Sequence, residues 1–365
     1  MKGAFILRKL SQLKKQLKQK KQVPPALTKS DEKMVKKIVD ETSLLNKNNV
    51  TRTKAYLDFY RRNPAIHWSF LAHMVSRNGG WNMTDLKGSL HSRLMDRSER
   101  ETFFSFLERS NWLIFQDAYP QLLLYEESSK RKKPLFHLLP ALHVSFFMKC
   151  AWDFFWQERD SYLLTMALIV NEQNYLESRV VQHPGYQAVF STVEFKMQDL
   201  LSMNHILFPY VKGGKVKLAG ATVHQFERLH ERILIGKRLY GILFGSGLKM
   251  VEKWASSTTH TGSRKDYWPH LFNSVDEGMP GLALKPRLIS CKLTPGSPRI
   301  YSPKLEFSWK DRKHEKVEPG DWYKDSNVLS YLEGSLESLG GEIEAEYCST
   351  LRKLELAGIL GEVVE

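Results

Sequence analysis

The sequence predicts a mainly α-helical protein: a large, bundle-like domain of many helices, an irregular proline-rich segment and a C-terminal helical pair. Three observations carry this prediction. Apolar residues recur at spacings of three and four along most of the first 255 positions, which is the helical period. Seven of the 15 prolines fall within residues 269–325, where they exclude regular helix. With 42% hydrophobic residues among 365, the chain can bury a core without a disulfide or metal.

The same pattern divides the chain into four parts. The boundaries follow the shifts in charge, periodicity and proline content. The parts are a basic amphipathic arm at 1–25, a helical core domain at 31–255, an irregular proline-rich segment at 256–325, and C-terminal helices packing on the core at 326–365.

The arm holds most of the net charge of +14, because residues 1–30 contain nine lysines and arginines and no acidic residue. Leu10, Leu13 and Leu17 lie on one face of a helix and lysines fill the other. Such a helix can anchor to a membrane surface, contact DNA or RNA phosphates, or pack its leucines on the protein itself. It could also pair with the acidic C-terminal end. The candidate polyanion contacts are Lys9, Lys14, Lys15, Lys18, Lys20 and Lys21.

Helices are predicted first over 30–46, 51–62 and 64–77. Thr51 is expected to cap the second of these. The third is expected to end at Asn78, Gly79 and Gly80, because Asn and Gly accept the left-handed conformation that closes a helix.

The middle of the chain is predicted to alternate helices with turns. Ser98 with Glu101, and Thr222 with Gln225, have the spacing of capping boxes. Pro120 is expected to break the apolar stretch around it. Gly213 and Gly214 favour a small hairpin. The helices are expected over 98–110, 140–157, 160–181, 188–208 and 222–244.

Beyond residue 255 the expected structure is irregular, with short strands within 288–293 and 300–309 and closing helices over 327–339 and 341–357. The chain has three cysteines, Cys150, Cys291 and Cys348. Their odd number and wide spacing predict neither a disulfide framework nor a zinc site. Cys150 lies in an aromatic helix, where a thiol is normally an inert core residue.

Residues 63–88 (NPAIHWSFLAHMVSRNGGWNMTDLKG) gather polar side chains around a predicted helix end. His73 and Arg77 are four residues apart and share a helix face. This segment could bind a small polar ligand, with His73 and Arg77 as donors and Asp85 as acceptor. Alternatively, Asn78 to Gly80 cap the helix and Trp81 fills the core. The candidate ligand-binding residues are His73, Arg77, Asn78, Trp81, Asn82, Asp85 and Glu172.

Glu172 belongs to a polar stretch, NEQNYLE at 171–177, inside an otherwise apolar helix. Buried polar groups need hydrogen-bond partners. We expect Asn171 and its neighbours to pair with an arginine or histidine of the 63–88 segment, either as a structural network or as the wall of a site.

A weak metal candidate is the pair Glu227 and His230, whose ExxH spacing occurs in di-iron helical bundles. Such a centre needs a second ExxH, which the chain lacks. We therefore predict neither a metal site nor a cofactor.

Residues 48–62 (NNVTRTKAYLDFYRR) together with 63–88 resemble the YppC-like family of uncharacterised bacterial proteins from Bacillus-type organisms, a domain of unknown function. The resemblance covers most of the chain after the arm. It implies a bacterial, cytosolic setting and supplies no activity, cofactor or catalytic residue to carry over.

No GxGxxG, P-loop, GxSxG or HExxH motif occurs. We therefore expect a cytoplasmic, non-enzymatic binding or interaction protein whose arm contacts a polyanion or membrane surface. The alternative is an enzyme or small-ligand binder with a polar pocket around His73, Arg77, Asn82 and Asp85. No transmembrane segment is expected, because the most apolar stretch, 134–156, contains charged residues, histidines and a proline.

Overall fold

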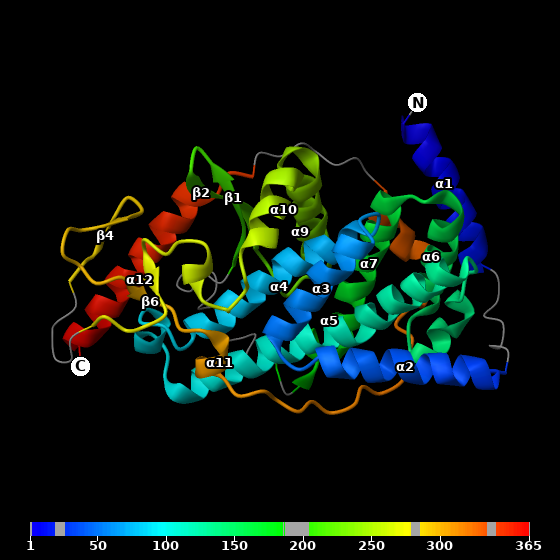
Figure 1. Cartoon of the computed structure of the whole chain (residues 1–365), viewed down its shortest axis with the longest axis horizontal. Coiled ribbons are helices and arrows are strands. Elements are labelled where there is room, and N and C mark those ends of the chain that lie inside the picture. The colour runs from blue at the N-terminus through cyan, green and yellow to red at the C-terminus, as the bar shows by residue number, and fades with distance from the viewer. Residues whose placement is uncertain are drawn as a thin grey trace.

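Long helices lie side by side through the middle of the molecule, with the shorter elements gathered at the other end from the N-terminus (Figure 1). This computed structural model describes residues 2–18, 26–184, 186, 204–278, 285–333 and 341–364. The predicted mainly α-helical fold class is confirmed. The helices of the central region are α2 (Lys29–Leu45), α3 (Asn49–Arg62), α4 (His67–Asp85), α5 (Arg97–Arg131), α6 (Phe146–Glu158), α7 (Ser161–Leu176), α9 (Leu229–Ile242) and α10 (Leu248–Ser257).

The helices α2 and α3 form where the sequence predicted them, because both start with reciprocal caps. The Thr28 side chain accepts from the N–H of Asp31, whose side chain accepts from the N–H of Thr28. At α3 the capping residue is Asn48, and Thr51 is its reciprocal partner rather than the cap itself. Helices α3 and α4 then pack against each other along most of their length.

The predicted end of the third helix at Asn78, Gly79 and Gly80 is wrong, because α4 continues through all three residues to Asp85. The glycine at 80 serves close packing. A Cβ there would lie 2.3 Å from Asn49 Oδ1 and 2.5 Å from His260 Nε2. The missing side chain lets two neighbouring segments approach, and the helical conformation is kept.

The predicted break at Pro120 is also wrong. Helix α5 is a single helix of 35 residues with Pro120 inside it. Proline removes one backbone hydrogen bond and costs about 3 kcal/mol in a helix interior. Packing against α2, α4 and α7 offsets that cost. Its capping box is formed by Asp96 and Glu99, two residues before the predicted Ser98 and Glu101.

Two antiparallel strands, β1 (His205–Lys212) and β2 (Lys215–Thr222), form the predicted hairpin. Gly213 and Gly214 occupy its turn with φ of 59° and 73°, values that favour glycine. The helix predicted over 188–208 is wrong at its end, since 205–208 are strand, and 188–203 lie outside the described residues. The helix predicted from Thr222 begins only at Leu229, because Gln225 has a left-handed φ of 51°.

The region predicted as two helices, 140–157 and 160–181, contains more secondary-structure elements than expected. A 3-10 helix spans Phe136–Leu142 and precedes α6, and a π-helical turn, Glu177–Val181, extends α7. A second π-helical turn, Leu243–Gly247, joins α9 to α10. Cys150 on α6 is buried and free, as expected. The main core lies among these helices, the hairpin and the C-terminal segments.

The segment 256–325 is irregular, as predicted. Strands form within 288–293 as expected, but within 300–309 only residues 300–301 are strand and 305–308 are helical, and the strand at 272–273 was not predicted. Its elements are β3 (Phe272–Asn273), β4 (Leu288–Ile289), β5 (Lys292–Leu293), β6 (Ile300–Tyr301), α11 (Leu305–Ser308) and a 3-10 helix, Arg264–Asp266. Strand β3 pairs parallel with β6, and β4 pairs antiparallel with β5.

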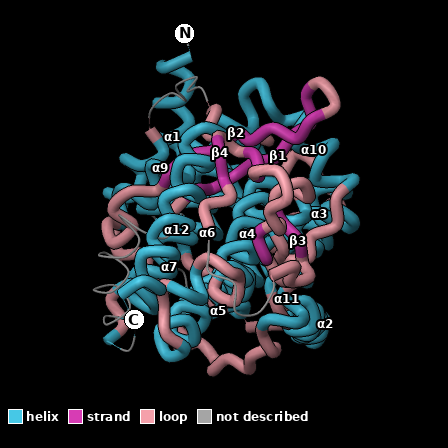
Figure 2. The backbone as a smooth tube through the Cα atoms, turned by 90° about the vertical axis from the view of Figure 1, so that its left-hand side faces the viewer, coloured by secondary structure: helices cyan, strands magenta, loops and turns pink. Residues whose placement is uncertain are grey.

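The predicted C-terminal helical pair consists of a 3-10 helix, Ser326–Leu332, and α12 (Glu344–Val364). The first is shorter than predicted, and 334–340 lie outside the described residues. Helix α12 contacts β2 and β4. Figure 2, viewed from the side nearest the C-terminus, shows α12 beside the hairpin.

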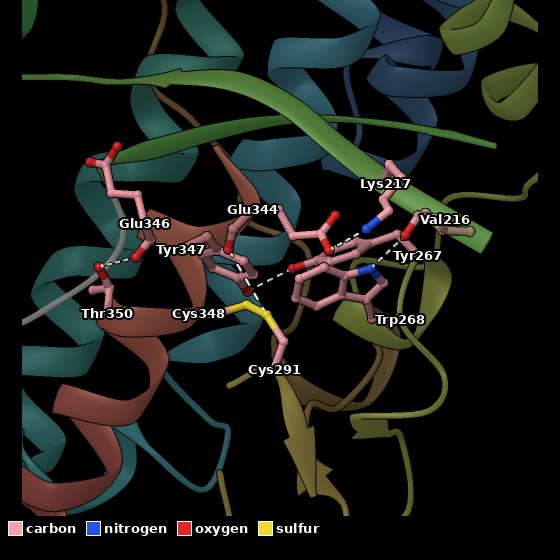
Figure 3. The surroundings of a disulfide bond; sticks show 10 residues. All are labelled: Val216, Lys217, Tyr267, Trp268, Cys291, Glu344, Glu346, Tyr347, Cys348 and Thr350. Carbon is pink, nitrogen blue, oxygen red and sulfur yellow. Dashed lines mark hydrogen bonds and ion pairs between the residues drawn. A yellow bond between two sulfur atoms is a disulfide. The ribbon is translucent and has the colours of Figure 1, made fainter. Parts of the chain in front are cut away.

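A disulfide joins Cys291 to Cys348 across 57 residues of sequence (Figure 3). The expectation of no disulfide is therefore wrong. Spacing alone could not reveal the pair, because the tertiary fold brings the loop after β4 against α12. Glu355 reinforces the same junction by accepting from the backbone N–H groups of Arg287 and Leu288, at 2.9 and 3.1 Å.

The arm forms helix α1 (Lys2–Lys18), and its leucines pack on the protein itself. Leu10, Leu13 and Leu17 are buried against α6 and the 3-10 helix 326–332. Figure 1 shows α1 and α12 at opposite ends of the molecule, so the two helices do not pair. No helix within the described ranges combines the length and the hydropathy needed to cross a bilayer.

Candidate functional site

A cavity of about 220 Å³ lies between the central helices and β1. Its wall is mostly apolar, with side chains such as Leu71, Phe106 and Ile169. Polar side chains enter it from α3, α4, α7 and α9. An apolar cavity of ~150 Å³ holds benzene, so this one has room for a substituted ring.

Arg52 on α3 contributes a guanidinium that is 1% exposed. Its Nη2 donates to Glu108 Oε2 at 2.5 Å, and its Nη1 donates to Asn46 Oδ1 at 3.2 Å. Burial would raise the pKa of Glu108, but the Arg52 charge and the His314 side chain outweigh burial and lower it. The ion pair is therefore formed at neutral pH. The Arg52 Nε–H has no partner among the described residues.

Tyr56 lies one turn further along the same face of α3 and also lines the cavity. Its ring packs edge-on against Trp68, with centroids 5.6 Å apart. Burial raises the pKa of the hydroxyl well above its ordinary value; Glu172 adds to this and Arg52 opposes it. The hydroxyl therefore keeps its proton. It forms no hydrogen bond with any of the described residues.

Glu172 on α7 supplies the carboxyl group of the cavity. Desolvation raises its pKa to about 7, although contacts with the Trp68 and Gln173 side chains oppose the shift. Gln173 Nε2 donates to Glu172 Oε1 at 2.8 Å. A carboxyl with this pKa exchanges a proton near neutral pH, where it can accept or donate a hydrogen bond.

Arg232 on α9 also lines the cavity, and its charge is likewise paired with a carboxylate. Its Nη2 donates to the carboxylate of Glu177, and its Nε donates to Gln173 Oε1 at 3.0 Å. The third bond runs from Nη1 to the carbonyl of Phe226 at 2.8 Å. Both arginines of the cavity wall are thus paired with a carboxylate.

The sequence-predicted candidates fall into two groups. Asn78, Asn82 and Glu172 line the cavity, whereas His73, Arg77, Trp81 and Asp85 are not part of its wall. All seven lie in the same part of the molecule, but most of their polar atoms bind the protein itself. Asn78 Nδ2 donates to the carbonyl of Leu207 at 2.9 Å, and Asn78 Oδ1 accepts from the Leu207 N–H at 2.7 Å. This amide therefore fastens β1 to α4.

His73 and Arg77 form a buried pair that holds the C-terminal end of α10. Arg77 Nε donates to His73 Nε2 at 2.9 Å, and His73 Nδ1 donates to the carbonyl of Thr53 at 2.8 Å. Burial, aided by the Arg77 charge, lowers the pKa of His73 well below its ordinary value. Arg77 Nη2 donates to the carbonyls of Ala255 and Thr258, at 3.0 and 2.5 Å.

Asn82 and Asp85 bind a fourth buried arginine, Arg264. Its Nε donates to Asp85 Oδ2 at 2.7 Å, and its Nη2 donates to Asn82 Oδ1 at 3.1 Å. Its Nη1 donates to the hydroxyls of Tyr267 and Tyr347, both at 2.8 Å. Figure 3 places these two tyrosines beside the disulfide. The cluster ties α4 to the irregular segment and to α12.

Asn171 finds partners other than the expected arginine or histidine of the 63–88 segment. Its Nδ2 donates to Asp117 Oδ2 at 2.6 Å, and its Oδ1 accepts from Ser145 Oγ and Trp322 Nε1, both at 2.9 Å. Gln121 Nε2 also donates to Asp117 Oδ2, at 3.0 Å. The neighbouring Glu172 does interact with the 63–88 segment, through the Trp68 side chain.

The weak metal candidates do not form a metal-ligand cluster. Glu227 precedes α9 and lies 3.8 Å from the guanidinium of Arg228. His230 lies on the helix, with its ring 5.7 Å from that of Tyr331. Over the described ranges, no three His, Cys, Asp or Glu side chains are arranged to hold a metal ion.

The candidate polyanion contacts differ in their surroundings. Lys9 is buried, and its Nζ donates to Asp160 Oδ2 at 2.7 Å. Lys14, Lys15 and Lys18 are exposed. The last two candidates, Lys20 and Lys21, lie outside the described residues.

Sequence reasoning missed Arg52 and Tyr56 as wall residues. A signal was present, because Arg52 stands on the same stripe as Ala55, Tyr56 and Phe59, at i, i+3, i+4 and i+7. An arginine on an apolar helix stripe must find a partner in the interior. Arg232 occurs in a similar setting on α9.

Comparison with known proteins places the chain among proteins without an assigned activity. The model of a family described as "Protein of unknown function (DUF2515)" matches residues 44–338. The "Uncharacterized protein YppC" of Bacillus subtilis (strain 168) is 44% identical over 236 residues, which are 64% of this chain and 73% of that protein. No solved structure matches.

Proposed function

This chain belongs to the family "Protein of unknown function (DUF2515)", and we propose that it binds a small, mainly apolar organic molecule in the cavity between α3, α4, α5, α7, α9 and β1. One observation carries the proposal. The apolar wall contains two buried hydrogen-bonding groups, Arg52 Nε–H and the Tyr56 hydroxyl, that the described residues leave without partners. An unpaired buried polar group costs about 1–3 kcal/mol, so a ligand that satisfies both gains that energy.

The shape and composition of the cavity agree with this role. Ligand sites are concave and mainly apolar, with a few polar groups that orient the ligand. Here the polar groups come from Arg52, Tyr56 and Glu172. The long helices around them make a rigid wall, which reduces the entropy lost on binding.

The proposal is tested by calorimetric titration of the full chain with isopropylbenzene, followed by thermal unfolding with and without it. We expect binding in the cavity and a higher Tm, since a ligand at 100 times its Kd stabilises by about 2.7 kcal/mol. Two cavity-filling variants, Ala72→Leu and Val75→Phe, should each abolish the titration heat while remaining folded. Leu44→Phe, at a residue that is 76% exposed, is the matched control. A wild-type protein that binds none of three probes of equal size, isopropylbenzene, acetophenone and benzoate, refutes the proposal.

A second candidate function rests on α1. Packing of the leucines on the core removes them from a membrane surface and leaves Lys14, Lys15 and Lys18 exposed in one helical stretch. We infer that these lysines contact the phosphates of a nucleic acid. The electrostatic part of such binding weakens steeply with salt, because bound counterions are released. A salt titration with duplex DNA, described among the predictions below, tests it.

A further inference from the structure

The two unpartnered groups of the cavity define what kind of atom they can bind. The Arg52 Nε–H is a donor only, and the Tyr56 hydroxyl has a proton to donate. The two side chains stand four residues apart on α3, which places them on one face. The guanidinium of Arg52 is also close enough to lower the pKa of the Tyr56 hydroxyl, against the effect of burial. One oxygen with two lone pairs could accept from both.

The charge on the wall argues that this oxygen belongs to an uncharged molecule. Arg52 is already paired with Glu108 at 2.5 Å, and Arg232 with Glu177. An anionic ligand would therefore meet no free cation among the described wall residues, and it would stand near the Glu172 carboxyl. A cationic ligand would face two guanidinium groups. The anion would be desolvated without compensation. The cation would meet one carboxyl group, Glu172, which is only partly ionised near neutral pH, against the two guanidinium groups.

From these observations we propose that the cavity takes an uncharged molecule with an apolar body and one carbonyl oxygen, which accepts hydrogen bonds from Arg52 Nε–H and the Tyr56 hydroxyl. This inference rests on the proposed function, because it names the ligand class for the same cavity. The apolar body would lie against side chains such as Leu71, Phe106 and Ile169.

The test compares three probes with the same number of heavy atoms: isopropylbenzene, acetophenone and benzoate. The first has no acceptor, the second has a neutral carbonyl, and the third has an anionic acceptor. We expect acetophenone to bind at least about tenfold more tightly than isopropylbenzene, the factor that corresponds to one net hydrogen bond. Benzoate should bind more weakly than acetophenone by a similar factor or more.

Two variants assign the preference to the named atoms. Tyr56→Phe removes the hydroxyl, and Arg52→Lys keeps a cation for Glu108 while removing Nε–H. Each should weaken acetophenone about tenfold and leave isopropylbenzene nearly unchanged. Tyr60→Phe is the matched control, because Tyr60 lies one turn further on α3, is buried, and does not line the cavity. If Arg52→Lys fails to fold, Tyr56→Phe and its control still decide the result.

The outcomes separate this inference from the proposed function. Binding of isopropylbenzene and acetophenone with equal Kd values, or an acetophenone preference that survives both variants, overturns the ligand class and leaves the cavity a binding site. Tighter binding of benzoate than of acetophenone overturns it as well. If none of the three probes binds, the proposed function itself has failed.

Discussion

Stability should depend on pH in an unusual direction because of one buried carboxyl group, Asp117 on α5. Its side chain is 5% exposed and accepts from Asn171 and Gln121. Burial raises its pKa to about 7; the bonds to these two amides and the charge of Arg179 oppose the rise, and Asp321 adds to it. In the unfolded chain the pKa returns to about 3.9. The folded protein therefore binds the proton more tightly than the unfolded chain.

The sign and size follow from linkage. Between these two pKa values the folded state holds one more proton than the unfolded state, so the free energy of unfolding falls as pH rises. The slope is about 1.36 kcal/mol per pH unit, so up to about 4 kcal/mol is lost between pH 4 and pH 7. Above pH 7 the contribution stays constant. Glu172, whose pKa is also raised to about 7, adds a loss of the same sign.

The perturbation is Asp117→Asn, measured by urea unfolding at pH 5 and pH 8. The amide keeps an oxygen to accept from Asn171 and carries no charge to desolvate. We expect the variant to lose less stability than the wild type between the two pH values, and to be the more stable protein at pH 8. Asp40→Asn, the same substitution at an exposed site on α2, should follow the wild type. If the unfolding free energy of the variant falls with pH as steeply as that of the wild type, Asp117 is not the source of the pH dependence.

The remaining predictions concern the packing and the arm. Asn78→Ala should lower the free energy of unfolding by about 3 kcal/mol, because it leaves the buried N–H and carbonyl of Leu207 without their side-chain partner. Urea unfolding measures this loss, and a value below about 1 kcal/mol would contradict the role of Asn78. Cys348→Ser should cost up to about 4 kcal/mol, the loop-closure entropy for 57 residues, and dithiothreitol should reproduce that loss in the wild type but change nothing in the variant. Replacing Lys14, Lys15 and Lys18 by Gln should weaken duplex DNA binding and lower the slope of log K against log salt by up to ~3. The matched control replaces Lys29, Lys33 and Lys36 on α2 by Gln and should leave that slope unchanged. Equal slopes for the two triple variants would rule out nucleic-acid binding by α1.

Local signals in the sequence were enough for the elements whose ends are set by their own residues. Helices α2 and α3 begin at side chains that cap them, and the glycines at 213 and 214 adopt the positive φ that closes a hairpin. In each case the interaction joins residues only a few positions apart. Periodicity similarly predicted the mainly helical class and the leucine stripe of α1.

Elements that depend on distant partners were mispredicted. The sequence predicts a helix end at Gly80, whereas this residue makes room for Asn49 and His260. It predicts a break at Pro120, but helices packed against α5 hold it continuous there. It also predicts that Asn171 pairs with the 63–88 segment, but its partners come from α5, the residue before α6 and residue 322. The disulfide likewise joins residues that are 57 positions apart, so the spacing of the cysteines does not predict it.

The fold class, the strongly basic first 30 residues and the polar character of α4 and α7 follow from the amino-acid pattern alone. The folded chain is needed to show that Asn78, Asn82 and Glu172 share a cavity wall while His73 and Arg77 bind the interior. It also brought Arg52 and Tyr56 into that wall with unpaired donors. The reason is physical: whether a buried polar group binds the protein or remains available to a ligand depends on which distant segments lie within hydrogen-bond reach, and spacing along the chain does not contain that information.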